Sequence, residues 1–264
     1  MLTFILLCLL VGAIVGFLAG LFGIGGGLVI VPTLVYLLPM MGIPDQMLMS
    51  TALGTSFATI VITGFSSAQR HHKLGNVVWS AVKVLAPVIM ITVFISGLFI
   101  GKLDREVSAK IFACLVVYLA AKMVISIKRN TVNAKPLTTQ SSVIGGILIG
   151  MASSAAGIGG GGFIVPFLNS RGIDMKKSIG SSAFCGALLG LSGMLSFMVS
   201  GWGNPSMPDY SLGYIYLPAV LGITATSFFT SKLGATATSK LPVSTLKKGF
   251  ALLLIAIAVD MFMK

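Results

Sequence analysis

One glycine-rich pattern occurs twice in this chain, at residues 16–32 and again at residues 150–166. The two copies align without a gap over their whole length, and the alignment places Gly23 on Gly157. A glycine in a helix interior is less favourable than an alanine by about 1 kcal/mol. A cluster of glycines with apolar flanks therefore predicts a break between two helices. Free backbone N–H and C=O groups at such a break must be buried in protein or face a polar ligand.

The composition of the chain predicts an integral membrane protein surrounded by membrane lipid. Of the 264 residues, 56% are hydrophobic and 9% are charged, whereas soluble domains carry about 25% charged residues. The formal net charge of +12 does not indicate a nucleic-acid partner. The Lys and Arg residues cluster between the apolar segments, as they do in the cytoplasmic loops of membrane proteins.

Both halves of the sequence show the same order of apolar segments. We expect an all-α polytopic membrane protein with two inverted-topology repeats, about eight transmembrane helices and glycine-broken re-entrant limbs. The first repeat is expected at 1–130, a cytoplasmic linker at 131–140 and the second repeat at 141–264. The predicted segments are 2–22, a limb at 28–40, 48–68, 77–101 and 111–127, then 142–156, a limb at 163–169, 178–200, 213–231 and 249–263.

The basic residues predict which loops share a side of the membrane. Loops rich in Lys and Arg are expected on the cytoplasmic side. By this rule the inner loops are 69–76, 128–140, 171–177 and 232–248, and the outer loops are 41–47, 102–110 and 201–212. These sides alternate only if each glycine-broken hairpin starts and ends on one side of the membrane. The first hairpin then enters from outside and the second from inside.

The two histidines of the chain, His71 and His72, allow two interpretations. They could serve a proton relay, because imidazole changes its charge near neutral pH. Between Arg70 and Lys73, however, we expect them to belong to an ordinary basic loop. No acidic residue stands out inside a predicted span as a coupling carboxylate.

Two glycine-rich turns that converge inside the protein would offer backbone N–H donors and helix N-termini to a small anion. Hydroxyl pairs on the next span of each half would add further ligands. The predicted substrate-binding residues are Gly23, Gly25, Gly26, Gly27, Thr55, Ser56, Gly157, Gly159, Gly160, Gly161, Ser181 and Ser182. The alternatives are that the glycines only allow close packing at a helix crossing, and that the hydroxyls only bond to their own helices.

Few charged or catalytic groups lie within the apolar segments. Lys83 lies inside the span 77–101, where snorkelling to the inner surface is the expected role and an anion-attracting vestibule is the alternative. The sequence shows no Ser/His/Asp set, no carboxylate pair and no His cluster with metal-ligand spacing. We therefore expect no enzyme activity, no metal and no cofactor.

Several motifs carry a resemblance to a known family. They are the run from Gly20 to Pro32 with its echo from Gly157 to Pro166, the triplets 54–56 and 180–182, and the Arg70-His-His-Lys73 segment. With these motifs the chain resembles the sulfite exporter TauE/SafE family of membrane anion permeases over essentially its whole length. One departure is that Ser181 and Ser182 replace the Thr-Ser expected in the second half. The resemblance implies a prokaryotic-type inner-membrane transporter of small anions such as sulfite and organosulfonates.

From the residues and the resemblance together, we expect a secondary transporter in a bacterial-type inner (plasma) membrane. It would export a small oxyanion, sulfite or an organosulfonate, by alternating access. Proton coupling and oligomer formation are both compatible with the sequence. The alternatives are an anion channel of the same fold and a membrane scaffold protein that transports nothing. Counterflow exchange separates a carrier from a channel, because only a carrier shows trans-stimulation.

Overall fold

A computed structural model describes residues 1–128, 137–242, 245–246, 248–249 and 252 of this chain. Most of these residues are helical, which confirms the expected all-α fold. The described α-helices are α1 (Leu2–Phe22), α2 (Gly27–Leu37), α3 (Leu48–Lys73), α4 (Trp79–Ile100), α5 (Arg105–Lys128), α6 (Thr139–Ala156), α7 (Gly161–Ser170), α8 (Met175–Ser200) and α9 (Leu217–Lys240). The smaller elements are two short turns, η1 (Leu38–Met41) and η2 (Asp45–Met47), and a hairpin of β1 (Ser211–Leu212) and β2 (Ile215–Tyr216).

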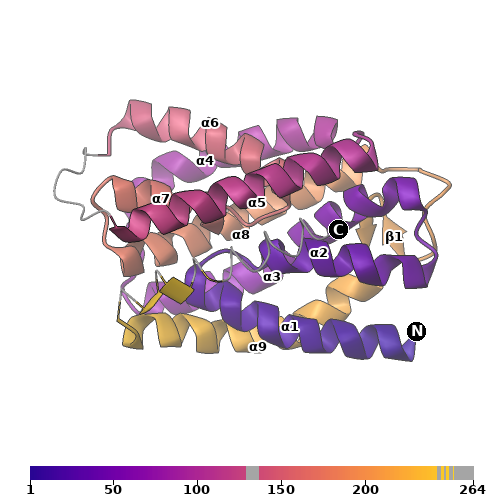
Figure 1. Cartoon of the computed structure of the whole chain (residues 1–264), viewed down its shortest axis with the longest axis horizontal. Coiled ribbons are helices and arrows are strands. Elements are labelled where there is room, and N and C mark those ends of the chain that lie inside the picture. The colour runs from indigo at the N-terminus through magenta and orange to yellow at the C-terminus, as the bar shows by residue number, and fades with distance from the viewer. Residues whose placement is uncertain (129–136, 243–244, 247, 250–251, 253–264) are drawn as a thin grey trace.

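The helices form an elongated bundle around two long central helices, α3 and α8 (Figure 1). On one flank α1 packs along α9, and on the opposite flank α6 packs along α4. Helix α9 also contacts α3, as α4 contacts α8. The two short helices also pack in matching ways, because α2 packs on α3 and α7 packs on α8. These three kinds of contact in the first half thus have matching contacts in the second.

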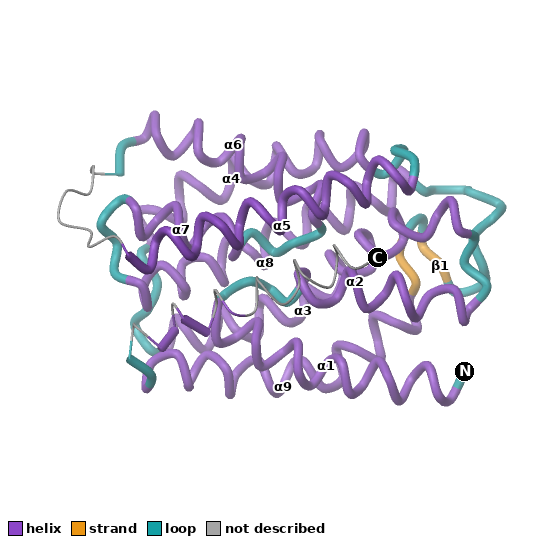
Figure 2. Tube along the Cα trace, in the orientation of Figure 1, coloured by secondary structure: helices purple, strands orange, loops and turns teal. Residues whose placement is uncertain are grey.

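Most loops gather at two opposite ends of the bundle, and two further loop segments lie between these ends (Figure 2). At one end Asp45 forms an ion pair with Arg105, and the side chain of Asn204 donates to the sulfur of Met47. At the other end Lys176 Nζ donates to the Ser239 carbonyl over 2.7 Å, and the Asn76 amide donates to the Ser239 hydroxyl over 3.0 Å. We call these the Asp45 end and the Ser239 end. The contacts at the Asp45 end join loops predicted to be outer, and those at the Ser239 end join loops predicted to be inner.

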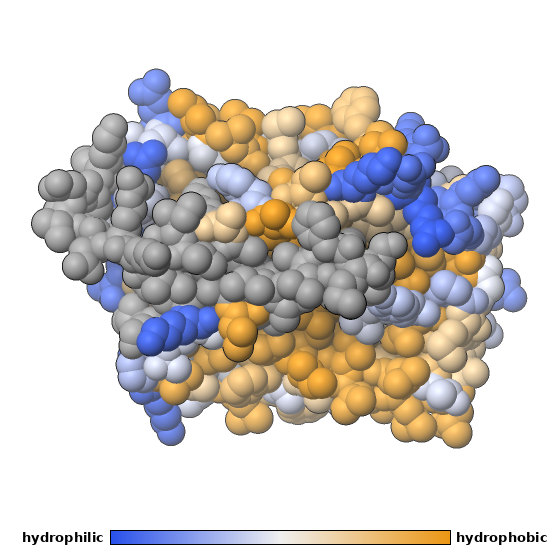
Figure 3. Space-filling model, viewed as in Figure 1, coloured by the Kyte–Doolittle hydropathy of each residue, from blue (hydrophilic) through white to orange (hydrophobic). Residues whose placement is uncertain are grey.

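The flanks of the bundle carry apolar side chains that water would not solvate well. Large hydrophobic residues are exposed along all four flanking helices, for example Leu10 of α1, Ile95 of α4, Leu148 of α6 and Phe229 of α9. Figure 3 shows apolar residues over the flank formed by α1 and α9, with hydrophilic residues toward the two ends. Exposed apolar surface of this extent marks an interaction with another apolar phase, and a lipid bilayer fits a band between two polar ends.

Four helical segments of the described chain are long and apolar enough to cross a membrane. They are Leu2–Phe22, Asp45–Lys73, Trp79–Ile100 and Met175–Ser200. This number is smaller than the predicted eight, in part because α9 has the length of a span but is rich in Ser and Thr. Its hydroxyls donate back to carbonyls one turn earlier, as Thr224 does to Val220 over 2.7 Å. Such bonds satisfy the hydroxyl within its own helix.

Three helices extend well beyond the apolar runs predicted, and one of them, α5, begins at Arg105 within the predicted loop 102–110 rather than at residue 111. The other two extend at their C-terminal ends. Helix α3 continues through Lys73, and α9 begins at Leu217 and continues through Lys240. The predicted loops therefore start later than expected, because a helix keeps its backbone hydrogen bonds after its side chains become polar. Arg70 illustrates this, since it donates from the last turns of α3 to the Thr236 hydroxyl of α9 over 2.9 Å. The predicted span 249–263 and linker residues 131–136 lie almost wholly outside the described residues.

Candidate functional site

Both glycine clusters break their helices in the same way. Helix α1 ends at Gly23, with φ of 67°, and α2 begins after Gly26, with φ of 89°. Helix α6 ends at Gly157, with φ of 59°, and α7 begins after Gly160, with φ of 75°. Side chains are unfavourable in this left-handed region, whereas glycine adopts it freely. We call α1 with α2 the first glycine hairpin, and α6 with α7 the second glycine hairpin.

The two hairpins meet each other backbone to backbone. A Cβ atom on Gly27 would overlap the carbonyl oxygen of Gly157, and a Cβ atom on Gly161 would overlap the carbonyl oxygen of Gly23. These two contacts are reciprocal, because Gly27 and Gly161 occupy matching positions in the aligned pattern. We call the contact zone of residues 23–27 with 157–161 the glycine crossing. The structure therefore brings together the eight glycines predicted for the site.

The glycine crossing lies deep within the bundle. A Cβ atom on Gly25 would be 3.2 Å from the Cα atom of Gly159, and Ile60 of α3 lies against both glycines. On the other side, Gly186 of α8 is packed against the Gly159 carbonyl so closely that a side chain would not fit. Ile60 and Gly186 both lie near the middle of the central helices, so the turns meet far from either end.

Two of the predicted hydroxyls hold the hairpins in place. Ser56 Oγ donates to the Gly157 carbonyl over 2.8 Å, and Ser182 Oγ donates to the Gly23 carbonyl over 3.1 Å. Both serines are fully buried. A buried carbonyl without a partner costs about 1–3 kcal/mol, so each serine satisfies a group that the broken helix leaves free. The serines thus lie against the crossing, and in this structure their protons go to the backbone.

The other two predicted hydroxyls bond to the starts of the flanking helices. The N–H of Tyr216 donates to Thr55 Oγ1 over 3.0 Å, and the N–H of Val78 donates to Ser181 Oγ over 2.8 Å. Tyr216 is the N-cap residue of α9, and Val78 is the N-cap residue of α4. Thr55 and Ser181 therefore cap the N-terminal ends of α9 and α4, one residue away from the serines that contact the crossing.

The first turns of α2 and α7 supply the N–H groups of the site. The Gly26 carbonyl accepts from Val29 and Ile30, as the Gly160 carbonyl accepts from the matching residues of α7. The N–H groups of the first helical residues have no intrahelical acceptor, by the geometry of an α-helix. These residues are Gly27 and Leu28 in α2, and Gly161 and Gly162 in α7. Each helix N-terminus also carries a partial positive charge.

The crossing is not neutralised by any ionised side chain among the described residues. Among the described residues, the buried polar side chains belong to serines, threonines and one histidine. This buried set contains no Lys, Arg, Asp or Glu side chain. The described residues also contain no cluster of His, Cys, Asp or Glu that could hold a metal ion. Two helix N-termini that meet in such surroundings provide a place where a small anion would be stabilised.

The buried histidine is His71, which sequence reasoning assigned to a basic loop. It lies in the last turns of α3, and its Nε2 atom is 3.0 Å from the Gly20 carbonyl of α1. Its Nδ1 atom is buried and has no hydrogen-bond partner in the described part of the chain, as is also true of the Ser67 hydroxyl one turn earlier. The signal for this burial was present in the sequence. Residues 60, 64, 67 and 71 continue the helical period of the buried face past the first charged residue.

The remaining candidates lie apart from these contacts. Lys83 is exposed in the first turns of α4, as a snorkelling lysine would be. Ser153 precedes the second turn of glycines, and its buried hydroxyl has no partner within the described chain. Ser154 next to it bonds to the Ser96 hydroxyl of α4 over 2.7 Å.

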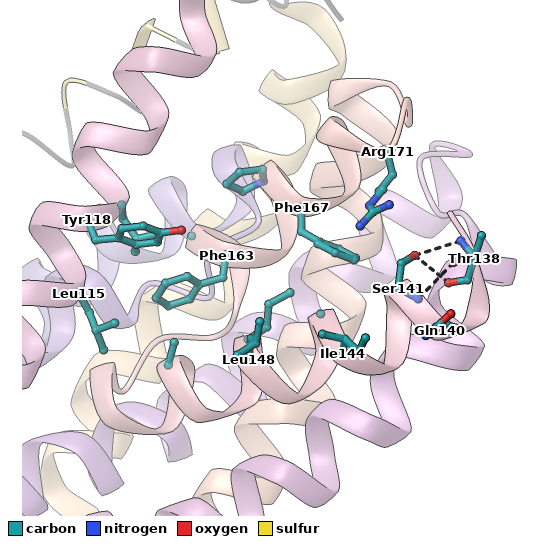
Figure 4. Close-up of a pocket in the computed structure, with 16 residues that line it drawn as sticks. Leu115, Tyr118, Thr138, Gln140, Ser141, Ile144, Leu148, Phe163, Phe167 and Arg171 are labelled. Carbon is teal, nitrogen blue, oxygen red and sulfur yellow. Dashed lines mark hydrogen bonds between the residues drawn. The ribbon is translucent and has the colours of Figure 1, made fainter. Parts of the chain in front are cut away.

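A cavity of about 430 Å³ opens between α5, α6 and α7 and reaches the start of α7 at Gly162 (Figure 4). Leucine, isoleucine and phenylalanine residues form most of its wall. Polar groups gather at the opposite end, where Arg171 lies near Ser141 and Thr138. An apolar wall with one cation at its mouth suits a lipid acyl chain and headgroup better than a free oxyanion. The glycine crossing is therefore the stronger candidate for an anion site.

Comparisons with known proteins agree with the membrane assignment. The model of the family described as "Sulfite exporter TauE/SafE" matches residues 8–261. A protein of Haemophilus influenzae named "Probable membrane transporter protein" is 81% identical over the full length of both chains. A relative from Methanocaldococcus jannaschii, also named as a probable membrane transporter protein, is 29% identical over 86% of this chain and 84% of its own.

A third relative, from Bacillus subtilis and again named as a probable membrane transporter protein, is 26% identical over 97% of this chain and 96% of its own. No solved structure matches the chain. The family model spans nearly the whole chain, including both glycine hairpins and the helices that hold them. The chain therefore belongs to the sulfite exporter TauE/SafE family of membrane transporters.

Proposed function

We propose that this transporter moves a small oxyanion, sulfite or an organosulfonate, out of the cell across a bacterial inner membrane. The observation that carries the proposal is the meeting of two helix N-termini, at Gly27 and Gly161, in a buried zone without ionised side chains among the described residues. Such an arrangement stabilises a negative charge by N–H groups and helix dipoles alone. The name of the family supplies the class of anion.

The transport cycle that we propose is alternating access between two inverted-topology repeats. The reciprocal contacts support it, since Ser56 and Ser182 each bond to the opposite hairpin and α1 pairs with α9 as α6 pairs with α4. About eight spans would complete the two repeats. The substrate reaches the N–H groups when one repeat rocks against the other and the two hairpins part.

A carrier is favoured over a channel by the closeness of the glycine crossing. The backbones of Gly25 and Gly159 are in van der Waals contact in the middle of the bundle. A continuous pore would need these turns to stay apart. In a carrier the two glycine turns need to separate only once in each transport cycle. A contact between two uncharged backbones is compatible with such a separation.

Thermal stability of the purified protein against a panel of anions is the first test. A ligand that binds only the folded state stabilises it by about 2.7 kcal/mol at a hundredfold excess over its dissociation constant. We expect a higher unfolding temperature with sulfite or sulfoacetate, but not with chloride. No increase with any of sulfite, thiosulfate, sulfate, sulfoacetate, acetate and phosphate, in a folded sample, would contradict the proposal.

Counterflow in proteoliposomes then tests the mechanism. Vesicles loaded with unlabelled sulfoacetate should accelerate the uptake of external labelled sulfoacetate, because the loaded carrier returns faster than the empty one. Equal uptake into loaded and empty vesicles would indicate a channel of the same fold. A complete lack of uptake, together with no thermal shift, would favour a scaffold protein.

A further inference from the structure

His71 occupies a position that the proposed anion site does not yet explain. Among the described residues, it is the one buried side chain that carries an imidazole, amine or carboxyl group. Imidazole is also the side chain whose ordinary pKa lies closest to neutral pH. His72, the next residue, is exposed and packs its ring edge-on against Trp79 at 5.4 Å. The chain thus places one histidine inside the bundle and one outside it.

The hydrogen bond of His71 fixes which nitrogen carries the proton. Nε2 lies 3.0 Å from the Gly20 carbonyl oxygen, and that oxygen can only accept. Nε2 must therefore be the donor, so that Nδ1 of the neutral ring holds a lone pair. Nδ1 is buried and has no partner among the described residues. A buried acceptor in that state is destabilising and calls for an explanation.

The surroundings of Nδ1 offer a way to hold an added proton. Ser67 lies four residues before His71 and therefore on the same face of α3. Its hydroxyl is also buried and, within the described chain, without a partner, so it is free to accept from a protonated Nδ1 once the two side chains turn toward each other. On the other side of the ring, Thr238 of α9 shares the Gly20 carbonyl with His71 and donates to the Leu21 carbonyl over 2.7 Å.

The position of Gly20 connects His71 to the anion site. Gly20 precedes Gly23 by three residues, which is about one helical turn. The Gly23 carbonyl accepts the hydroxyl of Ser182 at the glycine crossing. A positive imidazolium bonded to Gly20 attracts an anion bound at the first turn of α2. The attraction acts through protein rather than through bulk water, so it is weakened less. Proton binding and anion binding would therefore strengthen each other.

The other charged and titratable groups around this end of the bundle lie at its polar surface. On α3 they are Arg70, His72 and Lys73, while α1 and α2 carry none that ionise near neutral pH. The packed segments contribute Lys232 and Lys240 from α9, Lys176 and Lys177 from the start of α8 with Asp174 as its N-cap, and Lys248 near the C-terminus. Asp174 accepts from the backbone N–H groups of Lys176 and Lys177.

We propose that His71 is the proton-binding residue that couples anion movement to proton movement, an inference that rests on the proposed transport function. Nδ1 takes a proton from water on the side where the anion binds, and it releases that proton on the side where the anion leaves. Nε2 keeps its bond to Gly20 in both states. The proton and the anion thus travel in the same direction, so that export is driven by the outward concentration gradient of the anion, and no other co-reactant is needed.

The decisive variant is His71→Gln. The side-chain amide of glutamine can donate to the Gly20 carbonyl from the position of Nε2, but it cannot take up a proton near neutral pH. The matched control is His72→Gln on the exposed neighbour. A purely structural role for His71 predicts that both variants behave like the wild type, whereas a proton-binding role separates them.

The measurement is sulfoacetate accumulation in proteoliposomes under an imposed pH gradient, with an internal dye that reports proton uptake. Sulfoacetate stays ionised through neutral pH, so its own titration does not interfere. In the wild type we expect accumulation toward the alkaline side with matching proton uptake. His71→Gln should reduce gradient-driven accumulation by about tenfold or more, within the range of measured couplings between sites. Its counterflow exchange should persist. Gradient-driven accumulation by His71→Gln at the wild-type level would overturn the proposal.

A second readout does not depend on transport. Because the chain has two histidines, ¹⁵N-histidine labelling of the His72→Gln variant leaves the signals of His71 alone. We expect the Nε2–H tautomer at alkaline pH, with Nδ1 taking up the proton on acidification. A neutral Nδ1–H tautomer would overturn the assignment. If wild-type vesicles show neither counterflow nor net uptake, the proposed function fails, while these spectra still report on His71.

Discussion

The two glycine hairpins share one geometry at the crossing and differ in what holds them behind it. In the first, a Cβ atom on Gly16 of α1 would overlap the Thr230 hydroxyl of α9 and would be 2.6 Å from the Ser227 carbonyl oxygen. In the second, a Cβ atom on Gly150 of α6 would meet the side chain of Thr92 on α4 at 2.7 Å. The first hairpin thus lies against both backbone and side chain, and the second mainly against a side chain. Equal turns therefore do not imply equal freedom to move.

The polar contacts behind the turns differ as well. The Gly20 carbonyl accepts from Thr238 and lies beside His71 Nε2, whereas the matching residue of the second hairpin, Ser154, bonds to a serine of α4. In the register that aligns Gly54 with Gly180, His71 itself corresponds to Phe197. That ring packs on Phe57, with ring centroids 5.7 Å apart. Only the first hairpin has an ionisable group at this position, so we infer that it responds to protons and the second does not.

The largest expected effect tests whether the crossing is equivalent in both hairpins. Gly27→Ala and Gly161→Ala each put a Cβ atom onto a carbonyl of the opposite hairpin. We expect each change to lower the free energy of unfolding by about 3 kcal/mol, as overpacking of a rigid site does. Thermal unfolding of the purified variants, followed by intrinsic tryptophan fluorescence, measures the loss. If the two variants differ strongly in the loss of free energy of unfolding, the two hairpins are not equivalent at the crossing.

The control for this test is Gly162→Ala, one residue along α7. A Cβ atom there would meet the flexible end of Leu119, and the aligned residue of the first hairpin is already Leu28. Removing a glycine from a helix also favours the helix by up to about 1 kcal/mol. We expect Gly162→Ala to be neutral or stabilising. A loss similar to that of Gly161→Ala would mean that any added carbon at this turn is harmful.

A smaller effect tests the difference behind the turns. Gly16→Ala places a methyl group against the Thr230 hydroxyl and the Ser227 backbone of α9, while Gly150→Ala places it mainly against the Thr92 side chain of α4. We expect Gly16→Ala to cost about 1–2 kcal/mol more than Gly150→Ala, because overpacking against a rigid neighbour cannot relax. Comparison of the two unfolding temperatures in one detergent measures this. Equal costs would remove the distinction between a rigid and a compliant hairpin.

The sequence predicted the main parts of the fold because two of its signals are local. Glycine clusters break helices wherever they occur, and apolar runs mark segments that avoid water. The short helices were therefore placed within a few residues, with the limb 163–169 close to α7 (Gly161–Ser170). The end of α3 was missed, because a change to charged residues marks the edge of an apolar layer rather than the end of a helix.

The partners of the site residues were beyond the sequence, because they depend on contacts between distant segments. Ser56 and Ser182 were selected as ligands for a substrate, and each donates to a carbonyl more than 100 residues away in the chain. His71 was set aside because its neighbours in the sequence are charged. The helical period of α3 indicates its burial, but its partner Gly20 depends on where α1 packs, and no local pattern predicts that position.

The two serines offer a further comparison across the crossing. Ser56→Ala and Ser182→Ala each leave one buried carbonyl without its donor. We expect each to lower the free energy of unfolding by about 1–3 kcal/mol, the cost of a buried carbonyl left without a donor. If the two losses in the free energy of unfolding are equal and add in the double variant, the two hydrogen bonds stabilise the protein independently. A double variant that loses much more than the sum would show that the two hairpins support each other, since non-additivity measures coupling.

The smallest expected effect concerns Lys83 of α4. In the register that aligns the N-caps Val78 and Tyr216, Lys83 corresponds to Leu221 of α9, and both side chains are exposed. Lys83→Leu therefore makes the two helices alike at this position. An exposed substitution of this kind changes stability by about 0.5 kcal/mol or less. If Lys83 only snorkels, sulfoacetate transport should be unchanged at all salt concentrations.

If Lys83 instead attracts the anion toward the crossing, the Lys83→Leu variant should show slower transport at low salt. The difference from the wild type should vanish at high salt, because exposed charges are screened beyond about 3 Å at an ionic strength of 1 M. Initial rates of sulfoacetate uptake at several salt concentrations measure this. We expect no salt-dependent difference, since Lys83 lies on the lipid-accessible surface of α4 while the crossing is fully buried. A difference confined to low salt would assign an electrostatic role to the first half alone.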